Sequence, residues 1–211
     1  MKYYTICLSG LDSRQCVVVG GGKVAHRKVE GLLAAGARTR VISPQLVPEL
    51  VMLRDTGVVE VLSRCYENGD LAGAFLVIAA TDNPRVNQKV WVEAMQSGCL
   101  VNVVDDPQHS NFTLPAVVRR GDLCIAISTG GSSPALARRL REQMESLVGP
   151  AYEVLADLMA ELRPELMANF PAGEPRLQAA LRVIDSDILE VIRDQGREAA
   201  LSYGREKLHE R

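Results

Sequence analysis

The chain has 211 residues, of which 47% are hydrophobic and 24% are charged, and its formal net charge is -2. Such a chain is long enough for one large domain, or for a main domain and a smaller one, and its composition excludes a largely disordered protein. The small net charge provides no overall field for nucleic acid or an acidic membrane surface, so an anionic partner requires a local basic patch.

The cysteines and the apolar runs indicate the compartment. The five cysteines lie far apart, with no pair at metal-ligand or redox spacing, so we expect reduced thiols and no metal site. The first residues lack the apolar block of a signal peptide, and no run approaches the roughly 18 apolar residues of a membrane span. We expect a soluble, cytoplasmic protein with neither a membrane nor a nucleic acid as partner.

Short apolar runs alternate with helical patterns through the first half of the chain. The helix predicted over 45–57 is expected to break around Pro48. Alternating strands and helices predict an α/β fold with a doubly wound parallel sheet. The predicted elements are, in order, strand 16–19, helix 23–35, strand 38–43, helix 45–57, strands 58–63 and 74–81, helix 84–98 and strand 100–105.

The second half of the chain has a different character. Residues 112–129 predict two strands joined by a turn around Gly121, and residues 130–147 predict a glycine-rich loop that leads into a helix. Ser133 is the expected N-cap of that helix, with Pro134 at its first position. The remaining patterns are helical, so we predict three parts of the chain: a nucleotide-binding domain over 1–111, a connecting segment over 112–147 and an all-α domain over 148–211.

A run of three glycines follows the first predicted strand and opens a predicted helix. Gly20-x-Gly22-x-x-Ala25 fits the dinucleotide fingerprint in its alanine-ended form. Gly20 permits a tight turn, Gly22 permits close approach of a pyrophosphate, and Ala25 allows the helix to pack on the sheet. The motif predicts a Rossmann-type domain, with a plain tight turn as the alternative.

The second predicted strand lacks the acidic residue that usually binds the adenosine ribose. It ends in VISPQ, where Ser43 is a weaker hydrogen-bonding substitute. Arg38 and Arg40 lie near in sequence and are candidates for contact with a 2′-phosphate. The residues alone therefore leave NAD and NADP open.

Glycine or polar residues follow four of the five predicted strands, at what should be one edge of the sheet. Asp105 is either a base at that edge or a turn aspartate, whereas Asp106 is better explained as a turn residue before Pro107. His109 has no partner at metal-ligand spacing, and a structural or surface role is expected for it. The four positions after the strands are Gly20, Ser43, Thr81 to Asn83, and Asp105.

A local excess of arginines marks residues 119–141, where Asp122 is the single acidic residue. A solvated helix face is one explanation, and a site for a polyanionic small molecule is the other, since no aromatic residues interleave as nucleic-acid binding would favour. Before the helix, a loop of small residues forms a nest suited to anions. The arginines are Arg119, Arg120, Arg138, Arg139 and Arg141, and the loop residues are Ser128, Thr129, Gly130 and Gly131.

Four segments give the chain a resemblance to a known family: VVVGGGKVAHRKVEGLLAAGA, VIAATDNPRVN, VNVVDDPQHSNFTLPAVVRRGDL and IAISTGGSSPALARRLRE. Over residues 10–147 the chain resembles the precorrin-2 dehydrogenase family, which includes the N-terminal module of siroheme synthase. The resemblance implies an NAD-dependent homodimeric oxidoreductase that converts precorrin-2 into sirohydrochlorin, in sirohaem or cobalamin biosynthesis. Residues 112–147 resemble the family's dimerisation region.

The resemblance also implies roles for individual residues. The family's functional aspartate falls on Asp105, which would take a proton or orient the macrocycle. The many carboxylates of precorrin-2 would account for the arginines and the nest. NAD contacts are expected at Gly20, Gly21, Gly22, Lys23, Val24, Ser43, Pro44, Gln45 and Thr81, and substrate contacts at Asn102, Arg119, Arg120, Ser128, Thr129, Gly130, Arg138 and Arg139.

Two alternatives stay open at this point. Some members of the family also insert iron, and no residue pattern decides whether this chain is a ferrochelatase as well. A non-catalytic module that senses NAD(H) would use the same glycine fingerprint but needs no tetrapyrrole site.

Overall fold

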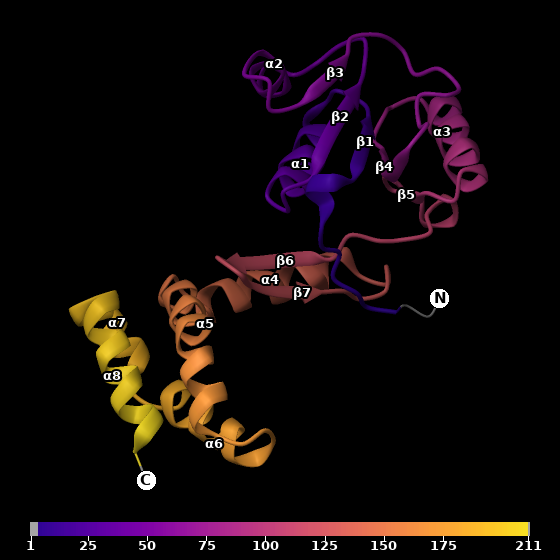
Figure 1. Ribbon diagram of the computed structural model, residues 1–211. Helices are drawn as coiled ribbons and strands as arrows, with labels where there is room; N and C mark the ends of the chain where they lie inside the picture. The colour runs from indigo at the N-terminus through magenta and orange to yellow at the C-terminus, as the bar shows by residue number, and fades with distance from the viewer. Residues whose placement is uncertain (1–3, 211) are drawn as a thin grey trace. The chain divides into compact units, whose positions relative to one another are not determined.

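The computed structural model describes residues 4–210, in two compact units that divide between Leu114 and Pro115 (Figure 1). Residues 1–3 and 211, the predicted ends of the first and last domains, lie outside the described residues. Among the helices of residues 4–210, none has both the length and the apolar character that crossing a membrane requires.

The first unit contains a five-stranded parallel sheet of order β3-β2-β1-β4-β5. The chain moves outward from β1 to β3 and then returns to the other side of β1, so the strand order reverses between β1 and β4. This arrangement confirms the predicted α/β fold with a doubly wound parallel sheet. The strands are β1 (Gln15–Val19), β2 (Arg38–Ile42), β3 (Glu60–Leu62), β4 (Ala74–Ala79) and β5 (Leu100–Val103).

Helices cover both faces of this sheet (Figure 1). Successive side chains of β1 enter two separate cores: Val18 packs in the cluster that contains Val29, and Val17 in the cluster that contains Val90. Because both faces are buried, the strands read as continuous apolar runs rather than as alternating ones. The helices are α1 (Lys23–Leu33), α2 (Pro48–Asp55) and α3 (Pro84–Gln96), with short 3-10 turns η1 (Leu11–Ser13) and η2 (Pro107–His109).

Three details of the first unit differ from the sequence prediction. Pro48 does not break a helix but begins α2, because the first position of a helix needs no amide donor. β3 has only three residues. β5 ends at Val103, so Asp105 does not end a strand.

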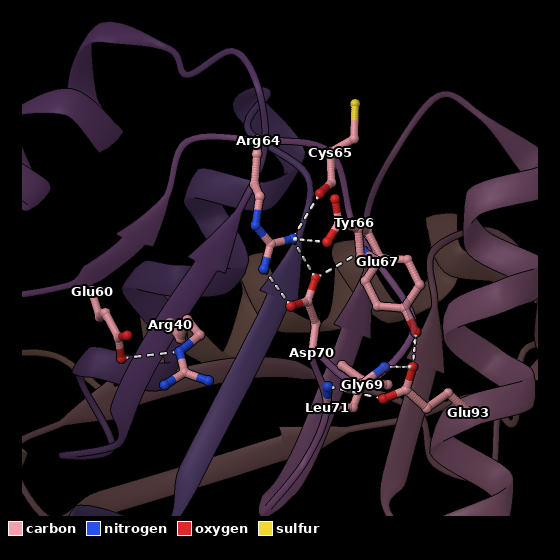
Figure 2. A network of polar contacts seen from close by, with 10 residues as sticks. All are labelled: Arg40, Glu60, Arg64, Cys65, Tyr66, Glu67, Gly69, Asp70, Leu71 and Glu93. Carbon is pink, nitrogen blue, oxygen red and sulfur yellow. Dashed lines mark hydrogen bonds and ion pairs between the residues drawn. The ribbon is translucent and has the colours of Figure 1, made fainter.

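The connection from β3 to β4 has no helix and is fastened by one buried carboxylate. Glu93 of α3 is 8% exposed and accepts hydrogen bonds from the Tyr66 hydroxyl, from Gly69 N (2.9 Å) and from Leu71 N (3.0 Å) (Figure 2). These bonds satisfy backbone donors that a helix would otherwise satisfy, and they fix the path of residues 64–71 beside α3.

The second unit consists of an antiparallel hairpin and helices. Ser133 caps α4 through a hydrogen bond from Leu136 N (3.2 Å), and Pro134 begins that helix, as predicted. One apolar cluster around Leu158, Leu162 and Ile188 forms the core of the last four helices. The elements are β6 (Ala116–Arg120), β7 (Leu123–Ile127), α4 (Pro134–Leu147), α5 (Ala151–Asn169), α6 (Glu174–Ile184), α7 (Ile188–Gln195) and α8 (Arg197–His209).

Candidate functional site

The carboxyl ends of the parallel strands meet at one edge of the first unit. Residues predicted to follow β1, β2, β4 and β5 therefore share this edge, around the point where the strand order reverses. Backbone hydrogen bonds join neighbouring strand ends there: Gly20 N to Ile42 O (2.9 Å), Ala80 N to Val19 O (2.8 Å) and Val104 N to Ala79 O (2.9 Å).

Gly20 and Gly21 lie too close to neighbouring backbone to carry a side chain. Gly20 has a φ of 131°, and a Cβ there would overlap the carbonyl oxygen of Ala80. A Cβ on Gly21 would overlap the carbonyl oxygen of Gln45. The sequence motif assigns Gly20 to a tight turn but does not reveal the contact that Gly21 makes with the loop after β2.

Gly22 differs from both, because no atom lies within 4 Å of the position that a Cβ would take. It is the N-cap residue of α1, and no side chain caps that helix. The first amides of a helix have no intrahelical partner, so this uncapped end beside open space can receive a phosphate. Ala25 is fully buried, which lets α1 approach the sheet. These residues fit the pyrophosphate of a dinucleotide, with Lys23 and Val24 in the first turn.

Ser43 is buried and directed into its own loop. Its hydroxyl donates to the carbonyl oxygen of Gln45 (2.7 Å). The hydroxyl proton is therefore not free for the predicted hydrogen bond to a ribose. Pro44 and Gln45 are exposed, and Val47 N binds Gly21 O (2.8 Å). The loop after β2 is therefore held against the glycine loop by its backbone.

Neither arginine of β2 lies where a 2′-phosphate would bind. Arg38 begins the strand and pairs with Gln15, which places it at the opposite edge, about 13 Å from the strand's end at 3.3 Å per residue. The guanidinium of Arg40, in mid-strand, lies 3.0 Å from the Glu60 carboxylate (Figure 2). The prediction that these arginines, being near Ser43 in sequence, contact a 2′-phosphate is wrong. Four residues of strand separate Arg38 from the edge of the sheet where the ribose would lie.

Thr81 closes a small network with the start of α3. Its hydroxyl donates to Asn87 Oδ1 (2.7 Å), and Asn87 Nδ2 donates to Thr81 O (2.9 Å). Asn83 caps α3 by accepting from Arg85 N (3.0 Å). These bonds fix the backbone after β4 at the edge where a dinucleotide would lie.

Asp105 lies in a tight turn just beyond β5. Asp106 N donates to Val103 O (3.1 Å), and Asp105 between them has a φ of 59°, the one positive φ of a non-glycine residue within 4–210. Its side chain is exposed, and its carboxylate has no hydrogen bond or ion pair to any residue that the structure describes. A left-handed backbone costs energy at a non-glycine residue, although aspartate tolerates it better than most. An unpaired carboxylate held this way is a candidate general base.

Three polar neighbours of Asp105 have structural roles. His109 Nδ1 lies 2.7 Å from the Asp106 carboxylate, and this bond lowers the pKa of Asp106. The His109 ring also packs edge-on against Trp91, with 4.7 Å between ring centroids. The side-chain amide of Asn102, a predicted substrate contact, donates to Phe112 O (3.1 Å) and so holds the chain that leaves the sheet.

Lys28 is a residue near Asp105 that the sequence interpretation missed. It lies on α1, three residues after Ala25, and is half-buried without an ion pair to any described residue. Burial lowers the pKa of Lys28, the charge of Arg27 lowers it further, and the charge of Asp105 opposes both. The sequence feature that could have identified Lys28 is its helical spacing from Ala25, which places a lysine beside the buried face of α1.

The predicted carboxylate anchors of the second unit have different surroundings. Arg138 and Arg139 are 78% and 71% exposed, and each pairs with Glu142, at 3.0 and 3.8 Å. Arg120 instead donates to the main-chain oxygen of Glu145 (3.3 Å) near the end of α4. Arg119 is exposed. Acidic residues just beyond position 141 therefore weaken the basic field that the sequence predicted.

The side chains of the predicted anion nest bind the loop's own backbone. The Thr129 hydroxyl donates to Ser133 O (3.1 Å) and accepts from Ser133 N (3.1 Å). The Ser128 hydroxyl accepts from Gly130 N (3.2 Å), and Gly130 has a φ of 62°. These bonds shape the loop before α4, and a role of its side chains toward a ligand stays a prediction.

Comparisons with known families match two segments of the chain. A family described as putative NAD(P)-binding matches residues 8–116, and one described as sirohaem biosynthesis protein central matches residues 120–147.

Individual proteins also match most of the chain. Siroheme synthase 1 of Aeromonas salmonicida is 42% identical over 179 residues, which are 85% of this chain and 38% of that protein. Siroheme synthase of Chromobacterium violaceum is 39% identical over 207 residues, 98% of this chain and 44% of that protein. The chain thus spans about two fifths of the length of these relatives. A solved structure described as SirC, precorrin-2 dehydrogenase, has a TM-score of 0.72 and 29% identity and covers 98% of both chains.

Proposed function

We propose, because this chain belongs to the putative NAD(P)-binding family, that it is an oxidoreductase that uses NAD to convert precorrin-2 into sirohydrochlorin. One observation carries the proposal: the open, uncapped N-terminus of α1 at Gly22, in a chain that matches a precorrin-2 dehydrogenase over 98% of both lengths. The curated relatives, named siroheme synthases, support a place in sirohaem biosynthesis.

The reaction removes one hydride and one proton from the substrate. When bound, NAD accepts a hydride from the substrate, and the second hydrogen leaves as a proton. Asp105 is the proposed acceptor of that proton, since its carboxylate is exposed at the carboxyl edge and has no partner among residues 4–210. Lys28 would keep a positive charge beside that carboxylate, and the backbone of Gly20 to Gly22 would hold the pyrophosphate.

Substrate binding is assigned to the second unit. Arg138 and Arg139 are the strongest candidates, because each guanidinium is mostly exposed and, among residues 4–210, is held only by Glu142 on the same helix. Exposed ion pairs of this kind contribute little to stability, so exchanging Glu142 for a substrate carboxylate costs little. Arg120 is a weaker candidate because its guanidinium already binds main-chain oxygens.

The assembly and the location belong to the same proposal. Residues 112–147 are proposed as a dimerisation segment and residues 148–211 as a helical C-terminal domain. A cytoplasmic location is supported by the five free cysteines, which suit a reducing compartment.

The decisive experiment is anaerobic incubation of precorrin-2 with NAD, followed by the absorbance of reduced nicotinamide. Asp105→Asn should lower kcat by about a hundredfold or more, the usual contribution of a general base. Asparagine also tolerates a positive φ, so this variant should keep its fold and its NADH affinity. Asp55→Asn, at an exposed carboxylate on α2, is the matched control and should react at the wild-type rate.

Two results would contradict the proposal in different ways. Wild-type rates in a folded Asp105→Asn protein would remove the aspartate from the mechanism. Tight NADH binding by the wild type without any oxidation of precorrin-2 would instead favour the sensing module.

A further inference from the structure

A groove of about 600 Å³ lies between α5 and α6, within the second unit. This volume falls in the range of about 300–1,000 Å³ that is typical of small-molecule sites. Its lining residues recur at helical spacing: Met159, Arg163 and Met167 on α5, and Arg176 and Ala180 on α6. Residues four apart share one face of a helix, so each helix presents a continuous stripe to the groove.

The groove is mainly apolar, and the protein's own side chains do not fill it. Small residues line it on both helices, Ala160 on α5 and Ala180 on α6. Two large apolar side chains in its lining stay exposed, Met167 at 55% and Leu177 at 51%. Protein interiors are normally close-packed, and exposed apolar side chains that gather in one place are typical of binding sites. The groove therefore favours an occupant with an apolar surface.

Both charged residues in the lining are arginines. Arg163 is exposed, and its guanidinium has no hydrogen bond or ion pair to any residue that the structure describes. Arg176 donates from Nε (3.2 Å) and Nη2 (2.9 Å) to Phe170 O, and its Nη1 has no acceptor among residues 4–210. Glu174, at the start of α6, accepts from the Gln178 side-chain amide (2.7 Å). Two guanidinium groups without a carboxylate partner favour an anion.

The acidic residues nearest to Arg163 along α5 are bound by another helix. Glu161 Oε2 accepts from Arg197 Nη2 (2.7 Å), and Glu165 Oε1 accepts from Arg205 Nε (2.9 Å), both from α8. These carboxylates are therefore engaged with α8, and the positive charge of Arg163 is left to the groove.

We infer that the groove between α5 and α6 is a further ligand site, for a small organic anion with an apolar body and one acidic group, such as a medium-chain fatty acid. The apolar walls would bury the body, and Arg163 with Nη1 of Arg176 would bind the acidic group. A polyanion such as precorrin-2 does not suit these walls, because most of its carboxylates would lose water without gaining a partner. The inference therefore concerns a ligand other than the proposed substrate and does not depend on the proposed function.

The competing explanation is a surface hollow that holds only water beside a solvated Arg163. A hollow of this kind would not distinguish an apolar anion from its neutral counterpart, and filling it would change no binding. Two dyes with the same rings and different charge separate the explanations.

The test is fluorescence titration of the full chain with 8-anilinonaphthalene-1-sulfonate and with N-phenyl-1-naphthylamine, which has the same rings but no sulfonate. NAD is present in excess, so that the candidate dinucleotide site is not open to either dye. The wild type should bind the sulfonate more tightly. Arg163→Gln should weaken sulfonate binding about fivefold, the effect of one partly exposed charge pair, and leave the neutral dye unchanged. Arg193→Gln, at an exposed arginine of α7, is the matched control and should change neither affinity.

A second variant tests the groove itself. Ala160 is exposed, so Ala160→Phe should fill the groove without disturbing the core, and it should weaken both dyes about tenfold or more. Ala168→Phe, at an exposed alanine of the same helix outside the lining, is its matched control and should bind both dyes as the wild type does. Equal wild-type affinity for the two dyes overturns the inference. Wild-type binding of both dyes by a folded Ala160→Phe protein overturns it as well.

Discussion

At the scale of single residues, three adjacent glycines are required for three different reasons. Gly20 combines a positive φ with close contact to Ala80, and Gly21 lies against Gln45. Gly22 has neither constraint, since its φ is -86° and nothing surrounds its missing side chain. Of these three glycines, Gly22 is the one whose missing side chain has no explanation inside the protein, and a bound pyrophosphate provides one.

This difference predicts opposite outcomes for two alanine substitutions. Gly22→Ala should melt at the wild-type temperature but bind NADH about tenfold more weakly or worse, because its methyl group enters the space for the pyrophosphate. Gly20→Ala should lower the melting temperature, because its methyl group overlaps Ala80 O. Thermal denaturation and NADH titration of both proteins check this. Full NADH affinity in Gly22→Ala would show that no phosphate lies at that position.

Asp105 is the residue for which sequence and structure differ most. The strand pattern placed it at the end of a strand, but it occupies the left-handed position of a turn, where glycine or asparagine would be favoured. Retaining a carboxylate at a strained position is consistent with a functional role.

At the scale of elements, the connection from β3 to β4 shows how side chains can order a long loop. It has no helix, and its order comes from side chains: Asp70 binds Arg64 within the loop, and Glu93 binds the loop from α3. Tyr66 is part of this network, and burial together with its bond to Glu93 raises the pKa of its hydroxyl. The loop therefore depends on the ionised Asp70 carboxylate, whose pKa is lowered by its hydrogen bonds from Arg64.

Stability in acid should report this dependence. The folded-state pKa of Asp70 lies below its ordinary value of about 3.9, so its contribution is complete above that pH and is lost as the pH falls through the folded-state pKa. Asp70→Asn should be less stable than the wild type at neutral pH, and the difference should shrink below about pH 4. Urea denaturation across a pH series measures it. A difference that stays constant into strong acid would contradict the assignment.

At the scale of the whole molecule, the proposal requires a homodimer formed through residues 112–147. Leu136 on α4 is 51% exposed, and Leu177 on α6 is exposed to the same degree. Sedimentation should give twice the mass of one chain, and Leu136→Glu should shift it toward the monomer, because a charge in an apolar interface is costly. Leu177→Glu is the matched control and should leave the dimer intact. A monomeric wild type at micromolar concentration would contradict the proposed assembly.

The sequence by itself determined the α/β class, the order of the elements and the place of the glycine loop. Buried parallel strands read as apolar runs, and a phosphate loop needs glycines at fixed spacing, so both are local patterns. Likewise, the cap at Ser133 and the helical character of the last sixty or so residues follow from neighbours along the chain.

Only the tertiary structure decided which residues lie near Ser43 and which arginines are paired. Arg38 and Arg40 are close to Ser43 in sequence, yet one lies at the far edge of the sheet and the other pairs with Glu60. Ser43 N and Arg64 N donate to the same oxygen, Leu62 O, because β2 and β3 run side by side, and Asp70 binds Arg64 because the loop folds back. Hydrogen bonds between segments distant in sequence leave no periodic pattern, and for this reason the local sequence does not reveal them.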